Sequence, residues 1–170
     1  MNIERIKVQV YNKSHNDLPI YATEFAAGID LKAMVDDNAR ILIYPGKREL
    51  IHTGLYVAIP EGYEIQIRPR SGMALKQLIT VLNTPGTIDS DYRGEIGVIL
   101  INHGEEAVGI SNGDRIAQAV IAPVNKIEWD KVNTFEELPT TDRAEGGFGS
   151  TGFKSNSDPD VKLDYMDNIK

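Results

Sequence analysis

The sequence predicts an all-β fold with one short helix. Its apolar residues come in short runs broken by turn residues at intervals of about 8–12 residues, which is typical of a β-sandwich or barrel. No apolar pattern with a helical period is sustained, and the chain has no internal repeat. Its length of 170 residues suits one domain with a sizeable core.

The elements follow in order along the chain. Within residues 62–69, three apolar side chains alternate with three polar ones, so one face of that strand is buried and the other meets water. A helix of about two turns is expected over residues 71–78, with Ser71 as its N-cap. Residues 84–94, with Pro, Gly and Asp, are expected to form a hairpin-like loop. The expected strands are 3–11, 28–35, 39–44, 52–60, 62–69, 79–83, 95–102 and 114–124.

Composition excludes several classes of function. A formal net charge of −7 argues against a nucleic-acid partner, because binding to the phosphate backbone needs a basic face. No apolar run approaches the ~18 residues of a membrane span, and the charged start MNIERIKVQV is unlike a signal peptide. The absence of cysteine excludes disulfides and thiolate chemistry and fits a cytoplasmic protein.

The segment RPRSG, residues 68–72, could bind an anion. The guanidinium of Arg70 can donate two hydrogen bonds to phosphate oxygens, and a helix beginning at Ser71 would present unpaired N–H groups. Gly72 would let a ligand approach those groups closely. An ordinary capped turn with solvated arginines explains the same residues equally well.

The segment TPGTIDSDYRG, residues 84–94, could carry catalysis. A carboxylate on a rigid turn, such as Asp89, can orient and deprotonate a water molecule. The ring of Tyr92 offers a flat wall against a sugar or base. Taken alone, however, Asp and Gly residues here are explained by the turn itself.

Two further polar residues lie in apolar segments. Asp30, in AAGIDL, needs either a structural partner or a hydrated metal ion, with the structural partner as the default. Gln118 follows a possible Asp114–Arg115 ion pair in SNGDRIAQ. The three histidines are far apart in sequence, so any divalent ion is expected to be Mg²⁺ held largely by substrate phosphates.

The glycine-rich segment GGFGSTG, residues 146–152, is either a flexible linker or a loop that closes over a phosphate. No Lys precedes Ser150 and Thr151, and no helical segment follows, so the segment is not a Walker A motif.

In this order, the segments AGIDL, RPRSGMA, NTPGTIDSDYRG, GDRIAQ and R-x-x-GGFGSTG resemble the five motifs of the homotrimeric all-β dUTP pyrophosphatases (dUTPases). The resemblance covers residues 5–153. It implies a jelly-roll-like (β-clip) subunit, three of which share three active sites in a homotrimer. The implied reaction is hydrolysis of dUTP to dUMP and pyrophosphate by attack of water on the α-phosphorus, with Mg²⁺ on the triphosphate. Such an enzyme limits uracil incorporation into DNA and supplies dUMP for dTMP synthesis.

The resemblance also implies residue roles. Asp89 would hold and activate the attacking water, and Tyr92 would pack against the deoxyribose and exclude a 2′-hydroxyl. Asp30 would contact Mg²⁺ through water. The other implied substrate-binding residues are Arg70, Ser71, Gly72 and Gln118 at the phosphates, Asn83, Gly86 and Gly97 at the uracil edge, and Arg143, Phe148, Gly149, Ser150 and Thr151 in a C-terminal arm.

These motifs divide the chain into a β domain over residues 1–142, a glycine-rich arm over 143–153 and a polar tail over 154–170. The tail is expected to be disordered or an accessory segment that could contact an unknown protein partner. The sequence departs from the family at Ala144 and Glu145, where glycine and a small polar residue are usual. Glu145 places a negative charge near the bound phosphates, which would make arm closure weaker or more dependent on Mg²⁺.

Two alternatives stay open. A dCTP deaminase relative would release ammonia from dCTP, although the intact Asp89–Gly94 stretch and the arm favour a dUTPase. A nucleotide-sensing module would bind dUTP and signal through the tail. The expected location is the cytoplasm, which would be the host cytoplasm for a viral protein.

Overall fold

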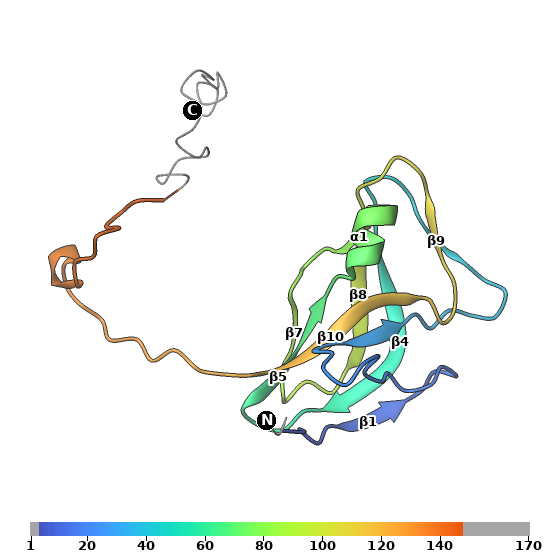
Figure 1. Cartoon of the computed structure of the whole chain (residues 1–170), viewed down its shortest axis with the longest axis horizontal. Coiled ribbons are helices and arrows are strands. Elements are labelled where there is room, and N and C mark those ends of the chain that lie inside the picture. The colour runs from blue at the N-terminus through green and yellow to red at the C-terminus, as the bar shows by residue number, and fades with distance from the viewer. Residues whose placement is uncertain (1–3, 148–170) are drawn as a thin grey trace, which may run out of the picture. The chain divides into compact units, whose positions relative to one another are not determined.

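The computed structural model describes residues 4–147 (Figure 1). The chain divides into two compact units, residues 1–126 and 127–170. Within the described residues, all strands lie in the first unit, and the second contains a 3-10 turn at Phe135–Glu137. No helix in this part of the chain is long and apolar enough to cross a membrane. The predicted limits of the arm and the tail stay predictions.

Two antiparallel four-stranded sheets build the first unit (Figure 1). One sheet has the order β1-β4-β8-β6, the other has the order β2-β10-β5-β7, and β3 and β9 form a separate antiparallel pair. The strands are β1 (Gln9–Asn12), β2 (Ile29–Lys32), β3 (Ile41–Ile43), β4 (Arg48–Ala58), β5 (Tyr63–Arg68), β6 (Ile79–Val81), β7 (Gly86–Ile88), β8 (Glu95–Asn102), β9 (Val108–Ile110) and β10 (Arg115–Pro123).

The core is made by apolar side chains from both sheets. Along β8, Ile96, Val98 and Leu100 are buried, while the residues between them are only half-buried. This alternation with a period of two is what a strand with one face on the core requires. Ile65 and Ile67 of β5 are buried in the same cluster, as the sequence pattern predicted.

The prediction of an all-β, jelly-roll-like subunit with one short helix is confirmed. The sequence did not reveal β7 or β9. Each has three residues and stands between turn residues, so neither shows a period of two. The expected loop over residues 84–94 therefore begins with a short strand that pairs with β5.

The helix α1 (Ser71–Gln77) lies where expected, but the predicted N-cap is wrong. Arg70 has the extended backbone of an N-cap, and its carbonyl oxygen accepts the hydrogen bond from the Ala74 N–H at 3.0 Å. Ser71 is consequently the first helical residue and makes no capping hydrogen bond. The helix ends at Gln77, and the C-cap residue Leu78 has a left-handed backbone with φ 54°.

Candidate active site

A charged cluster joins β2, β10 and the start of α1. The Arg70 Nε donates to Asp30 Oδ1 at 2.8 Å, and Arg115 Nη1 lies 3.5 Å from Asp30 Oδ2. Arg70 Nη1 also donates to the Arg115 carbonyl oxygen at 3.1 Å. The interpretation of Asp30 as a structurally paired acid is thereby confirmed. The possible Asp114–Arg115 pair does not form: Arg115 lies beside Asp30, and Asp114 accepts a hydrogen bond from the Ser111 N–H.

Gln118 belongs to the same cluster. In the sheet it lies between Asp30 of β2 and Arg68 of β5, and its Nε2 donates to the Pro69 carbonyl oxygen at 2.9 Å. This bond ties β10 to the segment that leads into α1. Ser71 follows directly and is exposed. Together with exposed Gly72, these groups line an open, cationic end of the sheet.

Asp89 and Tyr92 lie on the turn that follows β7. Both are exposed, and the Tyr92 N–H donates to the Asp89 carbonyl oxygen at 3.2 Å. Arg93 Nη1 donates to the carbonyl oxygens of Ser90 at 2.7 Å and Tyr92 at 2.8 Å. The guanidinium therefore holds the turn together from one side. This arrangement leaves the Asp89 carboxylate accessible to water.

Near Asn83, Gly86 and Gly97 the pairing between β6 and β8 ends. Pairing of β6 with β8 ends where the Leu82 N–H donates to the Ile99 carbonyl oxygen at 2.8 Å. Beyond this bond the chain leaves β8 and pairs with β5 through Gly86. Gly97 pairs with His52 on its other side, so within residues 4–147 no strand lies beside the β6-facing edge of Gly97. This edge can offer backbone groups to a ligand.

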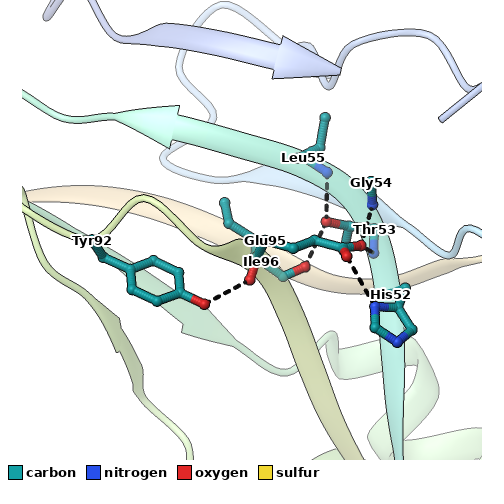
Figure 2. A network of polar contacts seen from close by, with 7 residues as sticks. All are labelled: His52, Thr53, Gly54, Leu55, Tyr92, Glu95 and Ile96. Atoms are coloured by element: carbon teal, nitrogen blue, oxygen red, sulfur yellow. Dashed lines mark hydrogen bonds and ion pairs between the residues drawn. The ribbon is translucent and has the colours of Figure 1, made fainter. Parts of the chain in front are cut away.

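The carboxylate of Glu95 organises the base of the turn (Figure 2). It accepts hydrogen bonds from the Gly54 N–H at 2.8 Å and the Thr53 N–H at 3.1 Å, and lies 3.0 Å from His52 Nδ1. Burial disfavours the charged form of Glu95, but the hydrogen bonds from Gly54, His52 and Thr53 outweigh it and lower its pKa. Glu95 is therefore ionised throughout the neutral range.

The tyrosine is tied to the same residue. The Tyr92 hydroxyl donates to the main-chain carbonyl oxygen of Glu95 at 3.0 Å, as Figure 2 shows. A Cβ atom on Gly94 would overlap the Tyr92 phenol, so a side chain at this position would displace the ring from its present place. The ring is thus held over the backbone of residues 94–95 with its hydroxyl anchored.

The predicted site residues form two groups in one chain. Asp30, Arg70 and Gln118 are connected through the charged cluster, whereas Asp89 and Tyr92 belong to the turn. Within residues 4–147, no side-chain hydrogen bond links the first group to the second. Arg143 lies in the second unit, where its Nε donates to the Gly146 carbonyl oxygen at 2.8 Å. Phe148, Gly149, Ser150 and Thr151 lie outside the described residues.

Protein side chains alone offer a poor metal site. No three His, Asp or Glu side chains within residues 4–147 gather closely enough to hold an ion. Asp30 is the carboxylate beside the phosphate-binding candidates, and it is partly exposed. Such a single acid fits Mg²⁺ that keeps most of its waters and takes the rest of its ligands from phosphates.

The sequence pattern predicts no role for Arg93 or Glu95. In the sequence Arg93 is one residue of the segment 84–94, and Glu95 is the first residue of the expected strand 95–102. An acidic residue that opens an otherwise apolar strand was the available signal, because a half-buried charge needs a partner. Its partners, at residues 52–54, are too far away in sequence to be identified from the pattern.

Known proteins resemble this chain closely. The dUTPase family model matches residues 14–152. The deoxyuridine 5′-triphosphate nucleotidohydrolase of Rhizobium rhizogenes is 55% identical over 136 residues, which are 80% of this chain and 85% of the relative. The protein of the same name from Syntrophotalea carbinolica is 56% identical over 136 residues, which are 80% of this chain and 89% of that protein.

The fold of this chain is also similar to the folds of solved dUTPase structures. The dUTPase of Staphylococcus bacteriophage 80alpha with dUPNHPP has a TM-score of 0.74 and 28% identity, covering 86% of this chain and 98% of its own. A mutant dUTPase from phage phi11 of S. aureus, described with a structural Mg(II) ion, has a TM-score of 0.67 and 25% identity, covering 76% of this chain and 99% of its own. With its sheets, its ordered motifs and these relatives, the chain belongs to the dUTPase family.

Proposed function

We propose a residue-level account of how this dUTPase hydrolyses dUTP to dUMP and pyrophosphate. The observation that carries it is the end of pairing between β6 and β8, which leaves the edge of β8 at Gly97 without a neighbouring strand in the described residues. Because β6 leaves β8 after the Leu82–Ile99 bond, the backbone edges at Asn83 and Gly97 are available to a flat base. Uracil presents an alternating set of acceptors and one N–H donor, which backbone groups can match. The amine of cytosine would place a donor where uracil has an acceptor.

The sugar would lie against Tyr92. Its ring is held by the hydrogen bond from its hydroxyl to the Glu95 carbonyl oxygen, and Gly94 leaves the space that the phenol occupies. A rigid wall under the C2′ atom leaves no room for a 2′-hydroxyl. Selectivity for deoxyribose would therefore arise from the position of the ring.

Asp89 would hold and deprotonate the attacking water. Its carboxylate is exposed on a turn whose backbone Arg93 holds through two carbonyl oxygens, so the main chain that carries it is fixed before substrate binds. A fixed base of this kind aligns the water for in-line attack on the α-phosphorus, and pyrophosphate leaves from the opposite side. The proton passes to the Asp89 carboxylate.

The phosphates would lie at the cationic end of the other sheet. Arg70 is oriented by Asp30, and Ser71, Gly72 and Gln118 lie beside it in sequence or in the sheet. The charge that develops on the phosphate oxygens is stabilised by donors that are already in place. By resemblance, Arg143 of the arm would bind the γ-phosphate, Ser150 and Thr151 would bind phosphate oxygens, and Phe148 would cover the uracil next to Gly149.

Asp30 would hold Mg²⁺ through water, and the ion when bound neutralises charge on the triphosphate. The Asp30 carboxylate is already paired with Arg70 and Arg115, so it has limited capacity for direct coordination. This supports an ion held mainly by the substrate.

A homotrimer with shared sites would bring the two groups of residues together. One copy would supply Asp89 and Tyr92, a second the cluster around Arg70, and a third the arm. The outward face of β4, β8 and β6 supports association, because Leu50 and Leu82 on that face are 51% and 44% exposed. Exposed apolar side chains that lie on one sheet face are typical of an interface.

We further propose that the reaction takes place in the cytoplasm and that residues 154–170 are a tail able to contact a protein partner. The acidic net charge of −7 supports the absence of a nucleic-acid partner.

The experiment that tests the function is direct. The purified chain is incubated with dUTP and Mg²⁺, and pyrophosphate and dUMP are measured, with dCTP, dTTP and UTP as matched substrates. Release from dUTP alone supports the proposal. A correctly folded protein that releases no pyrophosphate would overturn it, and ammonia from dCTP would assign a deaminase instead. Analytical ultracentrifugation across concentrations tests the trimer.

A further inference from the structure

The strand β4 contains an unusual bulge next to the active-site turn. Its pairing with β8 runs from Arg48 to His52, which faces Gly97, and resumes at Tyr56, which faces Glu95. Three residues of β4 therefore stand opposite the single residue Ile96. Such a bulge leaves backbone N–H groups without partners from the neighbouring strand.

The bulge is fully buried at its centre, so its donors need other partners. Thr53 is 1% exposed and Gly54 is also buried. The Glu95 carboxylate accepts from both N–H groups, and the Thr53 hydroxyl accepts from the Leu55 N–H at 3.2 Å. The same hydroxyl donates to the Ile96 carbonyl oxygen at 2.6 Å. A buried N–H without an acceptor is costly, so the carboxylate is needed to keep the bulge in this form.

Glu95 also connects this bulge to the turn, through its main-chain carbonyl group. Its carboxylate points toward β4, while its main-chain carbonyl oxygen accepts the Tyr92 hydroxyl, as Figure 2 shows. Fixing the side chain fixes the first residue of β8 and hence the direction of that carbonyl group. The position of the Tyr92 ring thus depends on the Glu95 carboxylate, because the ring is bonded to the main-chain carbonyl oxygen of Glu95 and the carboxylate fixes that residue against β4.

We propose that Glu95 is a positioning residue for substrate selection, which acts by holding Tyr92 where the ring excludes a 2′-hydroxyl. The inference rests on the proposed role of Tyr92 against the deoxyribose. Glu95 itself touches neither the sugar nor the phosphates. Its effect is expected in the ratio of kcat/KM for dUTP to kcat/KM for UTP, which a loss of stability alone does not change.

Two substitutions of Glu95 distinguish the shape of its side chain from its capacity to accept hydrogen bonds. Glu95→Gln keeps one carbonyl oxygen that can accept from Thr53 and Gly54, and its amide can donate to the His52 ring. Glu95→Ala removes every acceptor. We expect Glu95→Ala to lower the dUTP/UTP ratio by about tenfold or more, since small displacements of a positioning group have effects of this order, and Glu95→Gln to retain most of the ratio.

Tyr92→Phe cuts only the hydroxyl bond and leaves the bulge intact, so it remains informative if Glu95→Ala does not fold. We expect it to lower the ratio severalfold. Glu105→Ala, an exposed acid on the turn between β8 and β9, is the matched control and should leave the ratio unchanged. All ratios are measured at a temperature where thermal unfolding shows each variant folded.

The outcomes distinguish the two proposals. If Tyr92→Ala leaves the ratio unchanged, the role of Tyr92 against the sugar is wrong. If Tyr92→Ala lowers the ratio but folded Glu95→Ala does not, Tyr92 keeps its role and the inference about Glu95 is overturned. Where Glu95→Ala is unfolded, an unchanged ratio in Tyr92→Phe overturns the inference in its place.

Discussion

The guanidinium of Arg70 is paired with the carboxylate of Asp30 at 2.8 Å, and this pair links β2 to the start of α1. Asp30 also faces Arg115, so one acid orients two cations at the edge of the candidate phosphate site. The acid is only partly exposed, which limits screening of the pair by solvent. The pair lies 40 residues apart in sequence and depends on the pairing of β2 with β10.

Asp30→Asn should weaken substrate binding more than chemistry. The amide keeps the shape but loses the negative charge that orients Arg70, so KM for dUTP should rise severalfold and more Mg²⁺ should be needed, while kcat falls less. Steady-state kinetics over a Mg²⁺ series measures this. Asp37→Asn, on an exposed loop, is the control. An unchanged KM would show that Asp30 does not orient the phosphate site.

Asp89→Asn should lower turnover by about 10²–10⁴-fold, because the amide cannot accept a proton from water. Nucleotide binding should be largely kept, since the exposed side chain makes no structural hydrogen bond in the described chain. Pyrophosphate release gives kcat, and calorimetry with a non-hydrolysable dUTP analogue gives affinity. Asp91→Asn on the same turn is the matched control. Turnover that survives in Asp89→Asn would remove Asp89 from the mechanism.

Gly94→Ala should reduce discrimination against UTP, because the new methyl group would occupy the place of the Tyr92 phenol. Relative kcat/KM values for dUTP and UTP report the effect. In a Tyr92→Ala background the same substitution meets no ring and should add nothing further. Additive effects of the two changes would mean that Gly94 affects discrimination independently of the Tyr92 ring.

Stability should fall in acid through Glu95. Its pKa is lowered in the folded protein from an ordinary value of 4.5, so its contribution is complete above that value. The contribution is lost as the pH falls through the lower folded pKa. Urea unfolding from pH 7 to pH 3 should therefore show a shallower acid dependence in Glu95→Gln than in the natural chain. Equal slopes would contradict the role of the carboxylate in the bulge.

Ala144→Gly should ease the turn that precedes the glycine-rich segment. Ala144 has a left-handed backbone with φ 43°, where a non-glycine residue costs about 1–2 kcal/mol. Glycine should raise kcat/KM if this turn limits arm closure, and Ala144→Val should lower it because a β-branched residue fits this region worse. Steady-state kinetics of the pair measures the effect. Changes in the same direction in both variants would exclude backbone strain as the cause.

The sequence predicted much of the fold because most strands carry long apolar runs or clear alternation. The residues 62–69 and 95–102 were recognisable for this reason, whereas β7 and β9 were too short to show a period. Candidate site residues were found from motif order. The partners of Asp30 and Glu95 could not be predicted, because they depend on strand register between segments about 40 or more residues apart.

The bulge in β4 has a spectroscopic consequence. The amide protons of Thr53 and Gly54 are bonded to a carboxylate rather than to a peptide carbonyl group. Charge-assisted bonds of this kind are stronger than neutral ones, so these two protons should resonate downfield and respond to the ionisation of a side chain more than 40 residues away. Two backbone resonances would then report, in the intact protein, the ionisation state of Glu95, whose main-chain carbonyl oxygen accepts the Tyr92 hydroxyl.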